Sequence, residues 1–233
     1  MPDNSKIWCV VPAAGIGSRM GLEFPKQYLE VAGKPIIQHT IEALLKLNQI
    51  EGLVVCLAPH DRWFSSLQIN DDRIIVTEGG ATRAESVING LHRLQDMAQD
   101  DDWALVHDAA RPCVDPANIE AMIVALENQP VGGILAVEAK DTLKQAEIVD
   151  GKSFSQKTID RSRIWQAQTP QMIRYSKLSS ALKRCIEQGV NITDEASALE
   201  VVGESVMLCK GSASNIKVTT PEDHNLVEYL LTR

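Results

Sequence analysis

Short β-rich runs alternate with helical patterns along most of this chain, and this alternation restricts the fold more than any other feature. The predicted strands are Ile7–Pro12, Leu53–Ala58, Arg73–Thr77, Trp103–His107 and Gly133–Val137. Strands separated by helices form βαβ units, with a mostly parallel sheet that helices cover on both faces. Near-continuous apolar runs such as CVVPA and LVVCLA fit strands buried on two sides. We therefore predict an α/β fold.

Helices are predicted where apolar residues recur at helical spacing or where capping residues stand. Their ranges are residues 36–45, 87–94, 119–126, Leu178–Glu187, Asp194–Val202 and Pro221–Leu231. Thr193 is the predicted N-cap of the helix at Asp194–Val202. We find no internal repeat and no linker, so we expect one domain over residues 1–233.

The segment at about residues 140–165 breaks the α/β pattern. It is polar and loosely alternating, and Asp150-Gly151 at its centre is a strong signal for a type I′ hairpin turn. An isolated hairpin is only marginally stable in water, so this β-hairpin arm is expected to lie on another surface. A second copy of the chain is the expected surface, and packing on its own domain is the alternative.

Composition excludes several classes of protein. The net charge of −8 argues against non-specific nucleic-acid binding, which needs a basic surface. No apolar run is long enough for a transmembrane helix, and the N-terminus lacks a signal-peptide pattern. The five cysteines are scattered without CxxC spacing, which fits reduced thiols in a cytoplasmic protein. Cys9, inside a predicted strand, is expected to be a core residue.

Candidate ligand-binding residues follow the strands, because ligands of open α/β sheets bind at the carboxyl ends of the strands. AAGIGSRMG follows the first strand and matches neither a Walker A loop nor GxGxxG. Its small residues nevertheless let backbone N–H groups approach a triphosphate, and Arg19 and Lys26 add positive charge. The alternative is a tight turn with solvated cations.

Three later segments carry further candidates. EGGATRAESV offers a Gly79-Gly80 pair and the hydroxyl of Ser86, and HDAARP places Asp108 at a strand end, where it could hold Mg²⁺. A local salt bridge between Asp108 and Arg111 is the alternative. Lys217 precedes the last helix, and its alternative is a solvated lysine on an edge strand.

These segments indicate a nucleotide and a metal but no clear nucleophile or base; His107 is expected to fill a strand end instead. Nucleotidyl transfer requires neither group, since a phosphate monoester with a second pKa of about 6 is already anionic at neutral pH. Its attack on an α-phosphate depends on positioning and charge stabilisation.

Taken in order, the motifs PAAGIGSRM, PKQYL, GGATRAESV, HDAARP, TIDRSRIWQAQTPQ, ITDEAS and NIKVTTPED resemble the 2-C-methyl-D-erythritol 4-phosphate cytidylyltransferase family. The resemblance extends over essentially the whole chain. It implies a Rossmann-like nucleotidyltransferase fold and the CTP-dependent, Mg²⁺-dependent step of non-mevalonate isoprenoid precursor synthesis. Because the chain ends at Arg233, we expect the monofunctional form, without a fused cyclodiphosphate synthase.

The resemblance also implies roles for residues in the matching motifs. The residues that would contact the nucleotide are Ala13, Ala14, Gly15, Gly80, Ala81 and Ser86. The cations that would act at the reaction centre are Arg19, Lys26, Lys217 and Arg161. Some members of the family carry an acid where this chain has Ala81, so contact with the base is expected there through backbone alone.

For the acceptor, the residues implied by the resemblance are Asp108, Arg111, Thr142, Arg161, Thr169 and Thr193, with Asp108 also binding Mg²⁺. Arg161 lies in the arm, which in this family reaches across a homodimer into the neighbouring site. A ribitol 5-phosphate cytidylyltransferase is the nearer alternative. A non-catalytic nucleotide-binding protein is the other, and a mere binder would not need Arg19, Lys26, Asp108 and Lys217 together.

Overall fold

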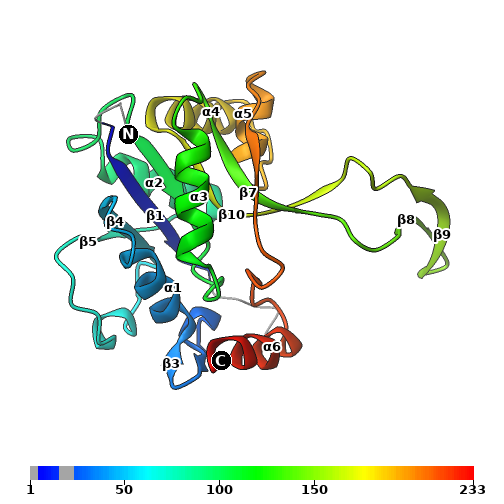
Figure 1. Cartoon of the computed structure of the whole chain (residues 1–233), viewed down its shortest axis with the longest axis horizontal. Helices are drawn as coiled ribbons and strands as arrows, with labels where there is room; N and C mark the ends of the chain where they lie inside the picture. Colours follow the sequence, from blue (N-terminus) through cyan, green and yellow to red (C-terminus); the bar gives the residue numbers. More distant parts are fainter. Residues whose placement is uncertain (1–4, 16–23) are drawn as a thin grey trace.

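The computed structural model describes residues 5–15 and 24–233, and this part of the chain forms a seven-stranded sheet flanked by helices (Figure 1). The strand order is β11-β7-β10-β6-β1-β4-β5. The strands are β1 Ile7–Ala13, β4 Ile50–Leu57, β5 Ile74–Glu78, β6 Trp103–Val106, β7 Gly132–Glu138, β10 Trp165–Arg174 and β11 Met207–Lys210. β10 is antiparallel to β6 and β7, whereas the other neighbouring pairs described are parallel. The predicted mostly parallel sheet is confirmed.

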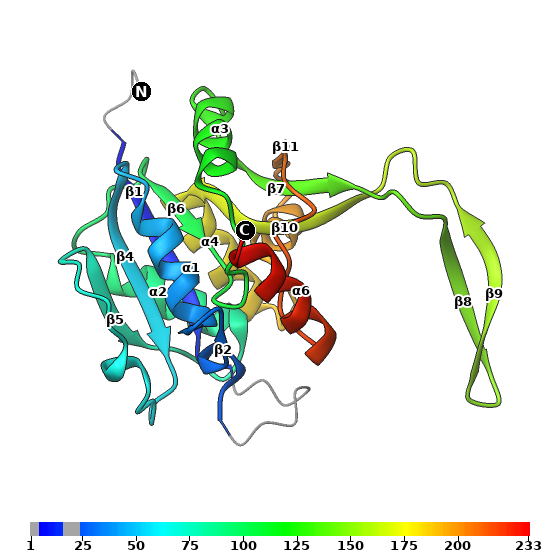
Figure 2. The same cartoon turned by 60° about the horizontal axis from the view of Figure 1, so that its bottom comes forward.

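Helices cover both faces of this sheet (Figures 1 and 2). They are α1 Ile36–Leu45, α2 Arg83–Arg93, α3 Pro116–Leu126, α4 Tyr175–Glu187, α5 Glu195–Val201 and α6 Pro221–Leu231. α1 and α3 pack in one apolar cluster with Cys9 and Val11 of β1, while α2, α4 and α5 pack in another with Trp8 and Val10. The alternating side chains of β1 are therefore buried on both faces, and Cys9 is a core residue as expected.

Smaller elements complete the described chain. Two 3₁₀ turns, η2 Lys26–Tyr28 and η3 Phe64–Ser66, lie in loops, and β2 Glu30–Val31 pairs with β3 Lys34–Pro35. α6 packs beside this small ribbon, where Val227 joins a third cluster with Val31. Among the described helices, none combines the length and the apolar character needed to traverse a bilayer.

The sequence patterns missed two strands of the sheet. β10, which lies between β6 and β7, contains Pro170 and several glutamines, and its register shifts between Ala167 and Gln171. A proline inside a run ordinarily argues against a central strand, which is why the pattern did not reveal β10. β11 is a short edge strand with mostly exposed side chains, so it lacks a clear apolar signal.

The predicted N-cap of α5 was wrong by one residue. Asp194, not Thr193, caps the helix: its carboxylate accepts from the backbone N–H of Ser197 at 2.9 Å, and the Ser197 hydroxyl accepts from the Asp194 N–H at 3.2 Å. This reciprocal capping box satisfies two N–H groups that the helix itself leaves unpaired.

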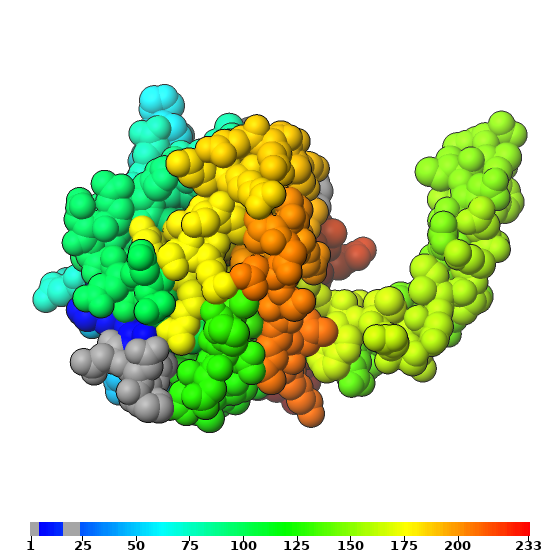
Figure 3. All heavy atoms as spheres, turned by 90° about the horizontal axis from the view of Figure 1, so that it is seen from above, coloured from blue at the N-terminus to red at the C-terminus, as the bar shows by residue number. Residues whose placement is uncertain are grey.

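Within the arm at about residues 140–165, β8 Leu143–Val149 and β9 Lys152–Ile159 form a hairpin. Asp150 and Gly151 both have positive φ, +48° and +73°, as a type I′ turn requires. Figures 2 and 3 show the hairpin projecting from the body of the molecule, and every residue of β9 is exposed. The alternative in which the hairpin packs on its own domain is therefore wrong.

Candidate active site

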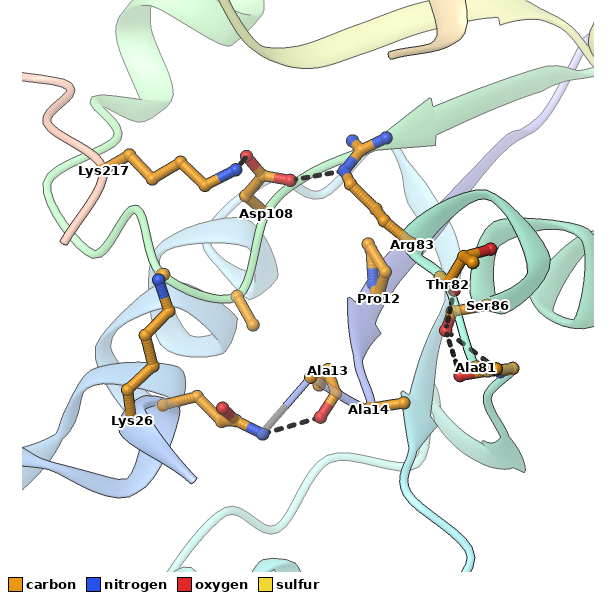
Figure 4. A pocket seen from close by; sticks show the side chains of 15 residues that line it. Pro12, Ala13, Ala14, Lys26, Ala81, Thr82, Arg83, Ser86, Asp108 and Lys217 are labelled. Atoms are coloured by element: carbon orange, nitrogen blue, oxygen red, sulfur yellow. Dashed lines mark hydrogen bonds and ion pairs between the residues drawn. The ribbon is translucent and has the colours of Figure 1, made fainter. Parts of the chain in front are cut away.

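A cavity of about 420 Å³ opens at the carboxyl ends of β1 and β6, where sequence analysis expected a ligand (Figure 4). Its described lining includes most of the predicted nucleotide and catalytic residues. These are Ala13, Ala14, Gly15, Lys26, Gly80, Ala81, Ser86, Asp108 and Lys217. Arg19, the other predicted loop cation, lies outside the described residues. The structure therefore gathers three loops and the lysine before α6 around one cavity.

Close packing brings the loop after β1 and the loop after β5 together. A Cβ on Gly79 would lie 2.6 Å from the Cβ of Ala14 and 2.9 Å from the Ser86 hydroxyl, so a larger residue does not fit there. On the other side, the buried Gln27 side chain donates to the Ala13 carbonyl at 2.7 Å. The backbone at the end of β1 is thus held on both sides.

A capping box shapes the loop before α2. The Thr82 hydroxyl accepts from the Glu85 N–H at 3.1 Å, and the Glu85 carboxylate accepts from the Thr82 N–H at 3.0 Å. Ser86 accepts from the Gly80 N–H at 3.0 Å and donates to the Thr82 carbonyl at 2.9 Å. Its hydroxyl is therefore already used to hold the loop, and Ala81 offers the cavity no polar side chain.

Asp108 is the electrostatic centre of the site, with 6% of its surface exposed. Its Oδ1 accepts from Arg83 Nε at 2.9 Å, and its Oδ2 accepts from Lys217 Nζ at 2.8 Å, from the opposite side (Figure 4). Arg111 Nε lies farther away, 3.6 Å from Oδ2. Burial would raise the pKa of Asp108, but Arg83 and Lys217 outweigh it and hold that pKa well below its usual range.

The structure revises the alternatives considered for Asp108 and for Lys217. The salt bridge between Asp108 and Arg111 exists, but Arg83 and Lys217 approach the carboxylate more closely. Lys217 is not a solvated lysine, because its ammonium group is paired with Asp108. Lys26 likewise has a partner: its Nζ donates to the carbonyl of Val218 at 2.7 Å, next to Lys217 in the chain.

Sequence analysis singled out neither Arg83, which lines the cavity, nor its buried partner Glu195. Arg83 lines the cavity, and its terminal nitrogens donate to the two carboxylate oxygens of Glu195 at 2.6 and 3.0 Å. Both residues stood in quoted motifs, GGATRAESV and ITDEAS. Nothing in either motif indicates the pairing, because 112 positions separate them.

Thr169 lies behind the cavity, in a buried chain of hydrogen bonds. Burial lowers the pKa of His107 to about 4, so its ring is neutral at pH 7. The Thr169 hydroxyl accepts from the Asp108 N–H at 3.1 Å and donates to His107 Nδ1 at 3.0 Å, while His107 Nε2 donates to the Arg111 carbonyl at 3.2 Å. In this arrangement Thr169 and His107 hold the backbone that carries Asp108.

The remaining predicted acceptor residues lie apart from the cavity lining. Arg111 lines a separate hollow of about 450 Å³, and its Nη1 donates to the Asn215 carbonyl at 2.7 Å. Thr193 is exposed just before α5. Thr142 and Arg161 are exposed in the arm, which projects away from the sheet (Figure 3).

The donor set fits Mg²⁺ only together with a phosphorylated ligand. Within the described residues, no cluster of three or more acidic, histidine or cysteine side chains could hold a metal. Mg²⁺ is commonly bound through one or two carboxylates plus substrate phosphates, and Asp108 supplies one carboxylate in the cavity. A carboxylate has about four lone-pair positions, and the close contacts of Arg83 and Lys217 leave positions of Asp108 open to a metal ion.

This chain is similar to known proteins over nearly its whole length. A family model described as 2-C-methyl-D-erythritol 4-phosphate cytidylyltransferase matches residues 7–233. A relative of that name from Ectopseudomonas mendocina is 49% identical over 94% of this chain and 93% of its own length. Another, from Pseudomonas aeruginosa, is 48% identical over 95% of this chain and 94% of its own length.

Solved structures show the same likeness. One described as 4-diphosphocytidyl-2C-methyl-D-erythritol synthase has a TM-score of 0.84 and 37% identity, over 98% of this chain and 100% of that chain. The Francisella tularensis 2-C-methyl-D-erythritol 4-phosphate cytidylyltransferase has a TM-score of 0.83 and 36% identity, over 97% and 100%. With sequence and fold matched over nearly its whole length, the chain belongs to the 2-C-methyl-D-erythritol 4-phosphate cytidylyltransferase family.

Proposed function

We propose that this enzyme transfers the cytidylyl group of CTP to 2-C-methyl-D-erythritol 4-phosphate, giving CDP-methylerythritol and pyrophosphate. The observation that carries this proposal is the cavity itself. Backbone of two loops lines one part of it, and Lys26 and Lys217 reach the other. Such a cavity suits a nucleotide whose negative charge concentrates at one end.

The residues divide the work between holding the nucleotide and receiving charge. Backbone of Ala13, Ala14 and Gly15 faces the triphosphate, and backbone of Gly80 and Ala81 faces the base and ribose. The acceptor phosphate attacks the α-phosphorus in line, and the bond from that phosphorus to the bridging oxygen of pyrophosphate breaks. The attacking oxygen carries no proton at neutral pH, so the protein needs no general base.

The cations act on the negative charge that moves toward the leaving group. Lys26 and Lys217 enter the cavity from different segments, and each can exchange its present partner for a phosphate oxygen. Arg19 stands four positions after Gly15 in the sequence and has the same proposed role. Charged donors fixed before the reaction stabilise the transition state without the cost of reorganisation.

Mg²⁺ belongs to this proposal as the expected cofactor. Asp108 would hold it together with phosphate oxygens of CTP. When bound, the ion would neutralise phosphate charge and polarise the phosphorus–oxygen bonds. Asp108 itself also contacts Lys217 and Arg83 at the edge of the cavity.

We further propose a homodimer in which the arm completes the neighbouring site. The support is that Thr142 and Arg161, implied to contact the acceptor, are exposed and flank the two strands of the hairpin. Ile148 and Phe154 on this hairpin are 75% and 54% exposed, which fits a surface that a second chain covers. We also propose a cytoplasmic location, in line with five free cysteine thiols.

The direct test is incubation of the purified protein with CTP, Mg²⁺ and either methylerythritol phosphate or ribitol 5-phosphate. We expect pyrophosphate release with methylerythritol phosphate, and a CDP-methylerythritol product identified by phosphorus NMR. Release with ribitol 5-phosphate instead would establish the alternative acceptor. CTP binding without release with either acceptor would indicate a nucleotide-binding protein.

A further inference from the structure

A buried ion pair beside the cavity has no role in the reaction described so far. The Glu195 side chain is 1% exposed and lies outside the described lining of the cavity, whereas Arg83 lies in that lining. Removing two charges from water is costly, and a buried pair is often no more stabilising than apolar residues of similar volume. The pair therefore calls for an explanation other than stability.

Glu195 is anchored independently of Arg83. Gln171, on β10, accepts from the Ala196 N–H at 2.9 Å and donates to the Asp194 carboxylate at 2.9 Å. The sheet thus holds the first turn of α5 from both sides of Glu195. The position of the Glu195 carboxylate is consequently fixed, so its hydrogen bonds can hold the Arg83 side chain in one conformation.

Arg83 connects this fixed point to Asp108. Its two terminal nitrogens contact Glu195, and its Nε contacts Asp108 Oδ1 at 2.9 Å. A guanidinium group is planar and rigid, so orienting its terminal nitrogens also orients Nε. Burial would lower the pKa of Arg83, but Glu195 and Asp108 outweigh it and raise that pKa, so the side chain stays charged.

We propose that Arg83, tied by Glu195, is a positioning residue that fixes the Asp108 carboxylate and thereby directs Lys217 into the cavity. This inference rests on the proposed function. Arg83 holds Oδ1 of Asp108, so Oδ2 points toward Lys217. The Lys217 ammonium contacts Oδ2 at 2.8 Å. Lys217 is 37% exposed, so without this contact its long side chain has several conformations open to it.

A direct phosphate contact by Arg83 is the competing explanation, and the structure opposes it. Glu195 engages both terminal nitrogens, which form the fork that ordinarily grips a phosphate. The negative charge of Glu195 also offsets the charge that Arg83 would offer. Arg83 therefore acts through Asp108.

Glu195→Gln is the most informative variant, because it keeps the shape of a residue that lies outside the described cavity lining. We expect kcat to fall roughly 10- to 100-fold, the usual cost of losing a partner that orients a functional group. The KM for CTP should change by less than about threefold, because the loss concerns the transition state. Glu200→Gln, at an exposed position of the same helix, is the matched control and should behave as wild type.

Two further variants distinguish a positioning role of Arg83 from an effect of its charge and from an effect on stability. Arg83→Lys keeps the charge but lacks the rigid planar group that couples the Glu195 contact to the Asp108 contact, so kcat should still fall. Arg83→Met/Glu195→Gln removes both charges, so its melting temperature should lie near that of wild type while kcat remains low. Arg93→Met, at an exposed position of α2, is the control for the arginine change.

Any of the three following outcomes would refute the positioning role of Arg83. A wild-type kcat in Glu195→Gln would show that the ion pair between Arg83 and Glu195 is not needed for catalysis. A raised KM for CTP with unchanged kcat in Arg83→Lys would indicate direct nucleotide binding. Recovery of kcat in the double variant would reduce the pair to a stability role. Wild-type protein that makes no CDP-methylerythritol would instead refute the proposed function, so the two failures are distinguishable.

Discussion

The arm permits a test in which two inactive variants restore each other. Arg161 lies on the exposed arm, whereas Lys26 lines the cavity at the sheet. If the arm reaches the neighbouring copy, each active site takes Lys26 from one chain and Arg161 from the other. Lys26→Ala and Arg161→Ala should each be nearly inactive when pure. In a dimer of one chain of each kind, one site carries both defects and the other carries neither.

The expected recovery follows from two-fold symmetry. If a fraction f of the chains carries one substitution, mixed dimers form with probability 2f(1−f), and each has one intact site of two. Activity relative to wild type is then f(1−f), which peaks at about one quarter in an equal mixture. A heterodimer purified through two different tags should have about half the wild-type activity per dimer.

A control heterodimer should give the opposite result in the activity assay. A wild-type chain paired with a Lys26→Ala/Arg161→Ala chain has one defect in each site if the arms cross, so that heterodimer should be inactive. If each arm served its own chain, the same heterodimer would retain half its activity, and the heterodimer of single variants would have none. Pyrophosphate release from the two tagged heterodimers distinguishes these cases. An inactive heterodimer of single variants would refute the crossing arm.

Three further predictions concern the site and its support. Lys26→Ala should lower kcat by about a hundredfold and change the KM for CTP less, since the lysine acts on transition-state charge; Lys46→Ala, at an exposed position, is the control. Calorimetry should detect Mg²⁺ binding only when CTP is present, and Asp108→Asn should raise the Mg²⁺ concentration for half-maximal rate; an unchanged value would mean that Asp108 does not hold the metal. His107, buried and neutral with a pKa lowered to about 4 from 6.5, gives stability above pH 6.5 that is lost as pH falls toward 4. Between pH 7.5 and 5 the free energy of unfolding from urea titrations should therefore drop by about 2 kcal/mol more in wild type than in His107→Gln.

Local patterns predicted the parts of the fold whose burial is regular. β1 and β4 are buried on both faces, so nearly every position is apolar and the strands are evident from the sequence. The turn at Asp150-Gly151 was equally predictable, because only a few residue pairs tolerate positive φ at both positions. β10 was not, since Pro170 interrupts it and Gln171 is buried to bond the first turn of α5 rather than to extend an apolar pattern.

The same distinction explains which site residues could be predicted. Loop residues that follow strands are predictable, because topology alone brings the carboxyl ends of parallel strands together. The contacts of Asp108 are different: Arg83 is 25 positions away, Lys217 is in the segment before α6, and Glu195 joins through Arg83, 112 positions from it. Such contacts depend on how α2, α5 and the Lys217 segment pack, which no local pattern encodes. Sequence reasoning could therefore find Lys217 and Asp108 as separate charges, whereas the tie that orders them required the folded chain.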